Sequence, residues 1–428
     1  MDTQFLSHNS HLEGLTHFKA KDPDLAHLQS LTHVYTFPLL EDIPINEPGI
    51  YALIGGCVTG KTTLLKQFME KLLIENVPAS SIFFLPKGFM TDHLALFHFL
   101  QTHVKDQTIQ YFLIDDISTI PEWESALSKA NTNDLLLHTI VIITDCNRSF
   151  ARTKQIEIKQ YFYLYPLTFR ESSQLLKINE DQLLKAFNDF LLHGGHLPAI
   201  NDLATTKKIS DATLNYYANR LNKELLRQKK QEHFLREILT AIIQNYNEPI
   251  TWNKLTTQLS IDHPKTIADY INLLATYDAV FIQSALLEKT LTLAPKKARK
   301  LMFTDPFIYH AIYAWLNLTK NSFDTQIIPS LNDTERCSQL VKSCVTTHFR
   351  RHFQTFYIKD EGEIDLAYIR EGRFWPLLIS WSNQLRIKDL KQLIKYQNAK
   401  ILTKTLRSGM IEHVRTEPLP WVLWSLKR

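Results

Sequence analysis

Small residues cluster at positions 55 to 62, where the sequence reads GGCVTGKT. The chain has only 11 glycines, yet Gly55, Gly56 and Gly60 lie within six positions. This spacing fits GxxxxGK[ST], in which backbone amides wrap a chain of phosphates at a distance that only glycine permits. In that chemistry Lys61 reaches the β and γ oxygens, while the Thr62 hydroxyl ligates magnesium.

We therefore expect a phosphate-binding loop rather than an ordinary glycine turn. A strand is expected before the loop and a helix after it, so that the phosphates also meet the positive N-terminus of that helix. The residues expected to contact ATP are Gly55, Gly56, Cys57, Val58, Thr59, Gly60, Lys61, Thr62 and Thr63.

Two consecutive acids, Asp115 and Asp116, follow the apolar run YFLI. Open parallel sheets place their sites at the C-terminal ends of strands, so these acids are expected beside the loop. We expect Asp115 to hold magnesium through water and Asp116 to polarise the attacking water. The alternative is that both are solvated loop acids.

Thr144 ends another apolar run, TIVIIT. If that strand lies between the strand before the loop and the strand before the acids, its hydroxyl points toward the γ-phosphate and takes part in catalysis. The alternative is a threonine that only forms a turn at the end of its strand.

The segments that would position these residues alternate in character from Gly49 onward. Helix-like stretches separate short runs that are apolar and rich in β-branched or aromatic residues. The runs are GIYALIG (49–55), SIFFLP (81–86), YFLIDD (111–116) and TIVIIT (139–144). Buried runs spaced by helices predict a parallel sheet covered on both faces, and hence an α/β fold.

The next part of the chain predicts helices. Thr168 and Glu171 have the spacing of a capping box at a helix start. A helix over residues 180–192 is expected to end at Gly194 and Gly195, because glycine tolerates the left-handed turn that ends helices.

Residues 232–287 give three helical patterns followed by the apolar strand AVFIQSALL, which is the order of a winged helix. Residues 295–300, PKKARK, are interpreted as a basic connector to the last unit. In that unit YIKDEGEIDLAYI and RFWPLLISWS predict two adjacent strands, and a helix is expected around RIKDLKQLIKY.

Length and composition limit the remaining options. The 428 residues suggest roughly two to four domains. The net charge of +4 argues only weakly for nucleic acid. No apolar run approaches the ~18 residues that span a bilayer, and the start lacks a signal-peptide pattern, so we expect no membrane contact and a cytoplasmic location. Export by a dedicated secretion machine stays open.

Neither cysteine nor histidine predicts a metal site. The histidines of the first 45 residues lack the close spacing of metal ligands. The cysteines are scattered without a CxxC pair and are expected to be reduced thiols. They are Cys57, Cys146, Cys337 and Cys344.

Taken in order, these segments resemble bacterial and archaeal ATPases of the AAA superfamily that carry a C-terminal domain of unknown function related to PD-(D/E)xK nucleases. The resemblance runs from about residue 45 to the end, through PGIYALIGGCVTGKTTLL, YFLIDD, YPLTFRES, HGGHLP, PKTIADYINLL, KLMFTDP and EGEIDLAYI...PLLISWSN. We accordingly expect five parts: an N-terminal segment (1–45), a P-loop ATPase core (46–165), a helical lid (166–230), a winged helix (231–294) and a nuclease-like domain (295–428).

The chain departs from such ATPases near the loop. In them the second acid after the buried strand is usually glutamate, whereas here it is the shorter Asp116, which weakens the expectation of efficient hydrolysis. An arginine often stands where Cys57 is, and a Gly-Arg pair commonly stands at residues 159–160, which here read KQ. If that arginine serves a neighbouring active site, its role is vacant. Arg148 or Arg152 are candidates to fill it, and both fit equally well as surface charges.

The nuclease pattern is degenerate. In it an aspartate, then Glu-x-Lys on the next strand, hold magnesium and activate water. Asp365 matches the aspartate, and Glu363 precedes it on the same face of the strand. Leu378 and Ser380 occupy the acid and lysine positions, and Lys342 stands near the place of a helix glutamate. One carboxylate cannot clamp a dication against a phosphodiester, so we expect no nuclease activity.

One helix of the last unit carries a basic face that would suit nucleic acid. Its cations are Arg386, Lys388, Lys391 and Lys395. Its apolar positions, expected to turn toward the core, are Ile387, Leu390 and Ile394. A solvated helix face is the alternative.

The winged helix is a weaker candidate for nucleic acid. Its third helix carries Lys265 but also Asp262 and Asp269, a poor balance for approaching phosphates. A protein contact there is the alternative.

The first interpretation of the whole chain is a magnesium-dependent ATPase, in which hydrolysis at Asp116 moves the helical lid and winged helix, and the degenerate nuclease-like domain reads out that motion. The competing interpretation is a non-catalytic switch or scaffold that binds ATP or ADP and a partner. A protein partner would bind through the winged helix or the C-terminal domain, and nucleic acid is weakly supported. A homo-oligomer is implied only by analogy. The biological process and the identity of the partner do not follow from the sequence.

Overall fold

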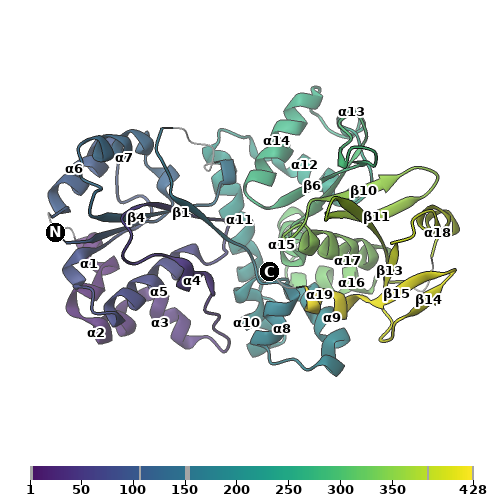
Figure 1. Ribbon diagram of the computed structural model, residues 1–428, viewed down its shortest axis with the longest axis horizontal. Coiled ribbons are helices and arrows are strands. Elements are labelled where there is room, and N and C mark those ends of the chain that lie inside the picture. Colours follow the sequence, from purple (N-terminus) through teal and green to yellow (C-terminus); the bar gives the residue numbers. More distant parts are fainter. Residues whose placement is uncertain (1–2, 106–107, 150–154, 383–384, 427–428) are drawn as a thin grey trace. The chain divides into compact units, whose positions relative to one another are not determined.

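The computed structural model describes residues 3–105, 108–149, 155–382 and 385–426. The chain divides into two compact units, Met1–Tyr165 and Pro166–Arg428 (Figure 1). Within the described residues no helix is both long and apolar enough to cross a membrane.

The first unit is built on a five-stranded sheet. Its strands are β1 (Gly49–Gly55), β2 (Ile82–Leu85), β3 (Gln110–Ile114), β4 (Thr139–Asp145) and β5 (Gln160–Leu164). They lie in the order β2-β3-β4-β1-β5, and every neighbouring pair is parallel. The expected parallel sheet is therefore confirmed, and each of the four apolar runs forms a strand.

Strand β5 was not expected. Its sequence QYFYL alternates exposed and buried positions, as is typical of an edge strand, and so it lacks the continuous apolar run of the other four. It pairs with β1, and its last residue, Leu164, is opposite Gly55 at the start of the loop.

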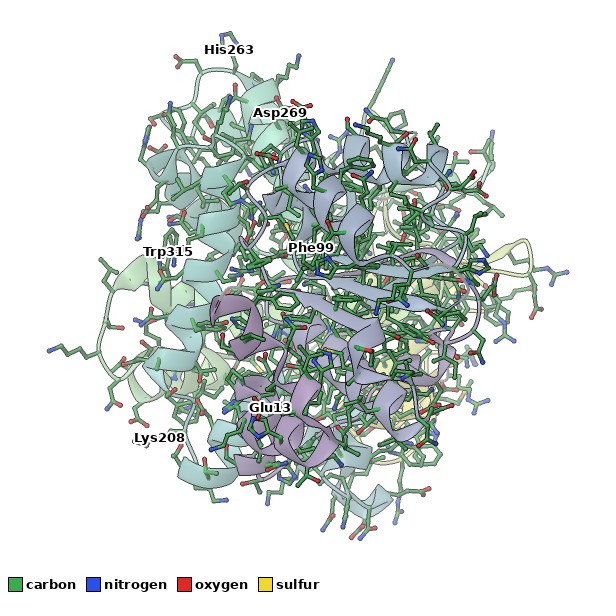
Figure 2. All side chains as sticks on the ribbon, turned by 90° about the vertical axis from the view of Figure 1, so that its left-hand side faces the viewer. Glu13, Phe99, Lys208, His263, Asp269 and Trp315 are labelled. Atoms are coloured by element: carbon green, nitrogen blue, oxygen red, sulfur yellow. The ribbon has the colours of Figure 1, made fainter. Side chains whose placement is uncertain are left out.

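Helices cover both faces of this sheet. Helix α5 (Lys61–Ile74) follows β1 directly, whereas α6 (His93–His103) and α7 (Trp123–Thr132) lie on the opposite side (Figure 1). Phe99, which is labelled in Figure 2, lies on α6, where it stacks on His103 at 4.1 Å and meets Phe83 of β2 at 6.0 Å. These aromatic contacts join α6 to the sheet.

The first 45 residues belong to the same compact unit. They form α1 (Thr3–His8), α2 (Leu15–Lys21), α3 (Pro23–Ser30) and α4 (Leu39–Asp42). Asp22 makes a fully buried ion pair with Lys66 of α5 at 2.8 Å. The ring of His11 bonds the carbonyl oxygen of Ile82 at 2.9 Å. No pattern in the sequence of this segment predicted that it packs on the helix after the loop.

The second unit begins with helices. They are α8 (Phe169–Leu175), α9 (Leu183–His193), α10 (Leu197–Thr206) and α11 (Asp211–Arg227). The expected capping box at the start of α8 is confirmed, because Thr168 and Glu171 cap each other's backbone amides. Helix α9 ends as expected at Gly194, whose φ of 55° lies in the left-handed region.

Three further helices precede an antiparallel pair of strands. The helices are α12 (Glu232–Gln244), α13 (Trp252–Thr256) and α14 (Pro264–Thr276), and the strands are β6 (Val280–Ser284) and β9 (Arg299–Phe303). The short strands β7 (Leu286–Leu287) and β8 (Thr292–Leu293) pair between them.

The interpretation of residues 295–300 as a connector was wrong at its end. Arg299 and Lys300 begin β9, where they pair with Ser284 and Gln283 of β6. Lys300 is buried, because its ammonium group pairs with a carboxylate of the last sheet. The basic sequence around Lys300 therefore does not indicate an exposed side chain at this position.

The last part of the chain combines helices with a mixed sheet. Helices α15 (Pro306–Asn317), α16 (Ile328–Asn332) and α17 (Thr334–Phe349) come first. The sheet contains β10 (Thr355–Lys359), β11 (Glu363–Arg370), β12 (Arg373–Ser380), β13 (Lys400–Thr403), β14 (Gly409–Ile411) and β15 (Val414–Pro418). Its order is β10-β11-β12-β13-β15-β14, and the expected adjacent strands β11 and β12 pair antiparallel. Helix α18 (Ile387–Ile394) lies between β12 and β13 in sequence, and α19 (Leu419–Ser425) ends the fold.

Of the three residues of α18 that we expected to face the core, Leu390 packs partly buried against it, whereas the other two are exposed. Ile387 is 72% exposed and Ile394 is 47% exposed, whereas Asp389, Gln392 and Leu393 are buried. Asp389 explains why α18 is turned about its axis relative to the expected orientation. Its carboxylate accepts the backbone N–H of Glu363 at 2.8 Å and so fixes the polar side of the helix against β11. The lysines of α18 are exposed as predicted.

Candidate nucleotide-binding site

The glycine-rich loop joins β1 to α5, and glycine is needed at positions 55 and 60 for different reasons. A β-carbon on Gly55 would overlap the carbonyl oxygen of Leu164 and lie 2.9 Å from the Thr59 hydroxyl. Gly60 has a φ of 95°, which a residue with a side chain rarely adopts. Val58 also lies in the left-handed region, with a φ of 58°. The loop is therefore tightly curled, and β5 forms part of its wall.

Lys61 is folded back into this loop. Its ammonium group donates hydrogen bonds to the carbonyl oxygens of Gly55 and Gly56, both at 2.8 Å, and the residue is buried. Burial alone would lower the pKa of Lys61, but nearby acidic groups outweigh it and raise that pKa. These groups belong to Cys146, Asp116, Cys57 and Asp115. A cation is thus held at the centre of the loop.

A series of hydrogen bonds connects the loop to two strand ends. The Thr62 hydroxyl donates to Asp115 Oδ2 at 2.8 Å, and the Thr144 hydroxyl donates to Asp115 Oδ1 at 2.7 Å. Thr144 also accepts the backbone N–H of Asp116 at 2.9 Å. The geometry arises because β4 lies between β3 and β1, which is the condition set for Thr144 from the sequence. Burial and the charge of Asp116 raise the pKa of Asp115, although the two hydroxyls oppose that shift.

Asp116 is more constrained than expected. It has a left-handed backbone with a φ of 51° and is almost completely buried. Lys87 pairs with its Oδ2 at 2.7 Å, and the Cys146 thiol donates to its Oδ1 at 3.3 Å. The acid proposed to act on water is therefore held from two sides.

Sequence reasoning missed Lys87 and Cys146. Lys87 follows the end of β2, and Cys146 follows the end of β4. The rule that pointed to Asp115, that sites collect at the carboxyl ends of parallel strands, would have found both. Cys57 lies buried within the loop, and its hydrogen bond with Cys146, together with burial, raises the pKa of the Cys146 thiol.

Of the two arginines that were candidates for the vacant role, the structure describes only Arg148. Arg148 lies with its guanidinium carbon 4.8 Å from the centre of the Tyr165 ring and 5.7 Å from that of Tyr163, in the same unit. Arg152 lies outside the described residues. Lys159, at the place of the expected Gly-Arg pair, forms an ion pair with Glu47 at 3.0 Å.

A comparison with protein families agrees with this geometry. Residues 47–173 match the family model described as an AAA domain. Over these residues the chain is similar to an AAA domain. The matched region begins just before β1 and includes the loop, both acids and Thr144.

Other comparisons are less informative. Residues 184–322 match a family described as a domain of unknown function, DUF8612. A single-residue variant of RuvB from Thermotoga maritima is 15% identical, with 66% of this chain and 90% of that chain covered and a TM-score of 0.30. The Drosophila ORC structure bound to DNA is 12% identical, with 74% and 99% covered and a TM-score of 0.25. No curated protein matches the chain.

The acids of the last sheet are paired with lysines. Asp365 forms an ion pair with Lys342 of α17 at 2.8 Å, and its Oδ2 accepts the backbone N–H of Ile379 at 2.8 Å. Glu363 pairs with Lys300 at 2.5 Å and with Lys359 at 2.9 Å. Burial would raise the pKa of Glu363, but these two ammonium groups lower it to about 2.

The neighbouring strand offers no further ligand at the predicted position. Leu378 packs in an apolar cluster with Ile364, Leu393 and Ile401. Ser380 donates its hydroxyl to the Ser382 carbonyl oxygen at 2.8 Å. Lysine ammonium groups thus stand beside the carboxylates where the resemblance implies a metal.

Proposed function

We propose that the AAA domain binds ATP with magnesium and hydrolyses it, and that the nucleotide state alters the second unit. The observation that carries the proposal is the hydrogen-bonded series from Thr62 through Asp115 to Thr144. It joins the residue after the loop lysine to the acid that follows β3, with β4 between β3 and β1, as a phosphate site with a metal requires. The family match over residues 47–173 supports the same conclusion.

The donor set fits magnesium, because Mg²⁺ prefers oxygen ligands such as hydroxyls and carboxylates. Thr62 would supply its hydroxyl, and Asp115 would hold the ion through water. When bound, the ion would neutralise charge on the phosphates. The loop amides would wrap the phosphates, Lys61 would turn from the carbonyl oxygens of Gly55 and Gly56 to the phosphate oxygens, and Thr144 would keep Asp115 oriented.

Asp116 would polarise the attacking water. Its contact with Lys87 favours a second candidate function, because an acid held by an ammonium group is a poor base. That second candidate is a switch or scaffold that binds the nucleotide and turns it over only incidentally.

We further propose that residues 231–294 form a winged helix and that residues 295–428 form an inactive nuclease-like domain. The exposed segment around the start of α14 contains Asp262, His263, Lys265 and Asp269, of which His263 and Asp269 are labelled in Figure 2. With two acids beside one lysine, this surface suits a protein partner better than a phosphate backbone. A homo-oligomer and a cytoplasmic location remain part of this proposal.

The test is nucleotide binding by calorimetry and phosphate release at steady state, both with the full chain. Lys61→Ala should abolish binding and turnover, because the loop loses its only side-chain cation. Lys105→Ala, which removes an exposed lysine of the same unit, is the matched control and should change neither. Binding of ATP without turnover above that of Lys61→Ala would favour the switch. Equal ATP binding by both variants and the unchanged chain would refute the proposal.

A further inference from the structure

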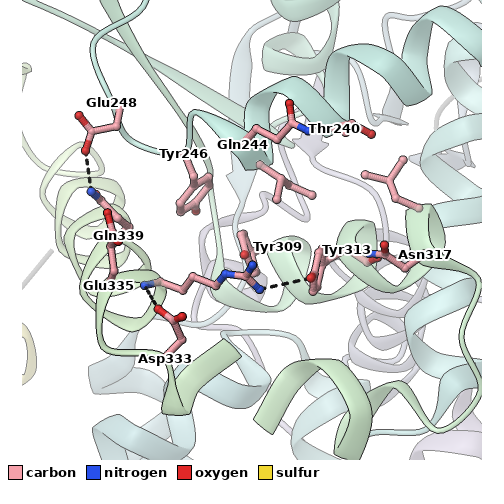
Figure 3. Close-up of a pocket in the computed structure, with 13 residues that line it drawn as sticks. Thr240, Gln244, Tyr246, Glu248, Tyr309, Tyr313, Asn317, Asp333, Glu335 and Gln339 are labelled. Atoms are coloured by element: carbon pink, nitrogen blue, oxygen red, sulfur yellow. Dashed lines mark hydrogen bonds between the residues drawn. The ribbon is translucent and has the colours of Figure 1, made fainter. Parts of the chain in front are cut away.

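A pocket of about 630 Å³ lies within the second unit, away from the residues of the nucleotide site in sequence. Figure 3 shows it between α12, which carries Thr240 and Gln244, α15, which carries Tyr309 and Tyr313, and the first turns of α17. Its volume lies within the range of about 300–1,000 Å³ that is typical of small-ligand sites. The proposed ATPase activity gives this pocket no role.

Three tyrosine rings form its aromatic wall. The rings of Tyr246 and Tyr309 meet edge to face with centres 4.9 Å apart, and those of Tyr309 and Tyr313 stack at 5.9 Å. The Tyr246 hydroxyl is already engaged, because it donates to the Ser343 hydroxyl at 2.9 Å and accepts the backbone N–H of Phe303. Tyr246 therefore shapes the pocket, whereas the hydroxyl of Tyr309 and the ring of Tyr313 can contact a ligand.

The hydroxyl of Tyr309 is the group of this aromatic wall that can form a hydrogen bond with a ligand. Only 5% of the residue is exposed, and its hydroxyl makes no hydrogen bond to any described residue. Burial raises the pKa of Tyr309 to about 12, so the phenol keeps its proton at neutral pH. Tyr309 lines the pocket, so its hydroxyl can form a hydrogen bond there with water or with a ligand.

The charge of the lining is negative. Glu248, Asp333 and Glu335 oppose the single cation Arg336. Asp333 is used in part to cap α17, because it accepts the Arg336 backbone N–H at 2.9 Å. Glu248 accepts a hydrogen bond from Gln339 at 2.7 Å (Figure 3). An excess of carboxylates at the rim attracts cations and disfavours phosphates.

Arg336 indicates which cation the wall accepts. Its guanidinium carbon lies 5.9 Å from the centre of the Tyr313 ring, and it donates a hydrogen bond to the Tyr313 hydroxyl at 3.3 Å (Figure 3). The side chain is exposed, and a surface arginine holds such a place weakly. An aromatic face beside carboxylates is the arrangement that proteins use to bind organic cations.

We infer that this pocket binds an organic cation with an alkylammonium or guanidinium group, which stacks on Tyr313, bonds Tyr309 and is neutralised by Glu248 and Glu335. The group could come from a free polyamine or from a lysine or arginine side chain of a protein partner. In either case the ligand competes with Arg336 for the same ring.

Calorimetry on the full chain, without nucleotide, tests this inference with three probes: agmatine, spermidine and an amidated pentapeptide with one central arginine. We expect saturable binding of at least one probe, weaker at high ionic strength. Binding of the free amines alone would identify a small-molecule site, and binding of the peptide alone would identify a side-chain site. A pentapeptide with leucine in the central position should not bind.

Four variants make the inference falsifiable. Tyr309→Phe removes one hydroxyl and should weaken binding about tenfold. Glu335→Gln should weaken it by about threefold to fivefold. Arg336→Ala should strengthen binding, because it removes the competing cation. Tyr216→Phe, which changes a tyrosine that is 63% exposed, is the matched control and should have no effect.

The inference is overturned if no probe binds, or if binding is equal in the unchanged chain and in the Tyr309 and Glu335 variants. It is also overturned if Arg336→Ala weakens binding of the cationic probes, since Arg336 would then support the site and not compete for it. Circular dichroism of each variant must match that of the unchanged chain. None of these results depends on ATP binding, so failure here and failure of the proposed ATPase are distinguishable.

Discussion

Thr62 and Asp115, which are separated by 53 positions in sequence, lie with their side-chain oxygens 2.8 Å apart. The contact joins the first turn of α5 to the end of β3. Neither residue would mark a metal site alone, but together they offer the two oxygen types that magnesium takes beside a nucleotide. The first prediction follows from this pair.

Asp115→Asn keeps the size of the side chain and removes its charge. We expect the affinity for ATP measured with magnesium to fall by at least about tenfold, which corresponds to ~1.4 kcal/mol. The affinity measured with a chelator should stay unchanged, because the loop itself is intact. Asp134→Asn, at an exposed turn, is the matched control. Equal loss with and without magnesium would contradict the assignment of Asp115 to the metal.

Asp116 can be tested by two substitutions of opposite direction. Asn adopts the left-handed backbone of this position as readily as Asp, so Asp116→Asn should fold, bind ATP and lose turnover. Asp116→Glu extends the carboxylate by one methylene past its contact with Lys87 and should raise phosphate release. If the Asn variant turns over ATP as fast as the unchanged chain, Asp116 has no catalytic role and the switch is the better description.

Gly55→Ala should disrupt the loop, because the added methyl group overlaps the carbonyl oxygen of Leu164. We expect a loss of stability of about 1–3 kcal/mol, typical of overpacking, together with loss of ATP binding. Thermal unfolding and calorimetry check both effects. Gly88→Ala is the control: its methyl group meets nothing within 4 Å, so it introduces only left-handed strain, and ATP binding should persist.

Stability should fall at mildly acidic pH. Burial lowers the pKa of His193 and His310 to about 4 and that of His348 to about 3. These histidines bind protons more readily in the unfolded chain, so stability is complete above their ordinary pKa of 6.5 and is lost as the pH falls from there toward 4. Each contributes a slope of at most ~1.4 kcal/mol per pH unit.

Buried acids oppose this trend, because burial raises the pKa of Asp115, Asp145 and Asp305. Burial raises the pKa of Asp305 to about 6 from its ordinary value of 3.8, so its contribution is lost as the pH rises through that window. Burial also lowers the pKa of His11 to about 4, and the four histidines together predict a lower unfolding free energy at pH 5 than at pH 7, which urea titrations will measure. His310→Gln should reduce the slope of the unfolding free energy against pH by the contribution of one histidine. Equal stability at both pH values would show that these groups titrate normally.

The lysine and acid pairs of the last sheet should contribute to stability and not to catalysis. Asp365→Ala leaves Lys342, which is mostly buried, without its carboxylate partner, so we expect a loss of about 3–5 kcal/mol. The double variant Lys342→Met with Asp365→Leu should recover most of that loss, because both charges are removed together. Magnesium-dependent cleavage of DNA or RNA that disappears in Asp365→Ala would contradict this prediction.

The sequence predicted those parts of the fold whose signals are local. Four strands of the first sheet are continuous apolar runs, and the loop is defined by its own glycines. The site residues Asp115 and Thr144 also follow from such runs, since both lie where a buried strand ends. The order of the strands, which brings these residues together, could only be stated as a condition on Thr144.

The missed features depend on contacts between distant segments. Strand β5 is half exposed, so its pattern is not apolar, and only its pairing with β1 defines it. The face of α18 was assigned from its apolar residues, whereas the hydrogen bond of Asp389 to Glu363 sets the rotation of that helix. Lys300 was assigned to a basic connector because no local signal reveals that a carboxylate 63 positions later neutralises it.

The carbonyl oxygen of Leu164 closes the wall behind Gly55, and Leu164 is also the last residue of β5. One residue later the first unit ends, so tension applied to the chain at Tyr165 acts on β5 before any other strand. Because β1 and β5 are parallel, their hydrogen bonds resist such a load together, in shear. Mechanical strain on the connection between the units is therefore transmitted to the backbone that would grip the phosphates.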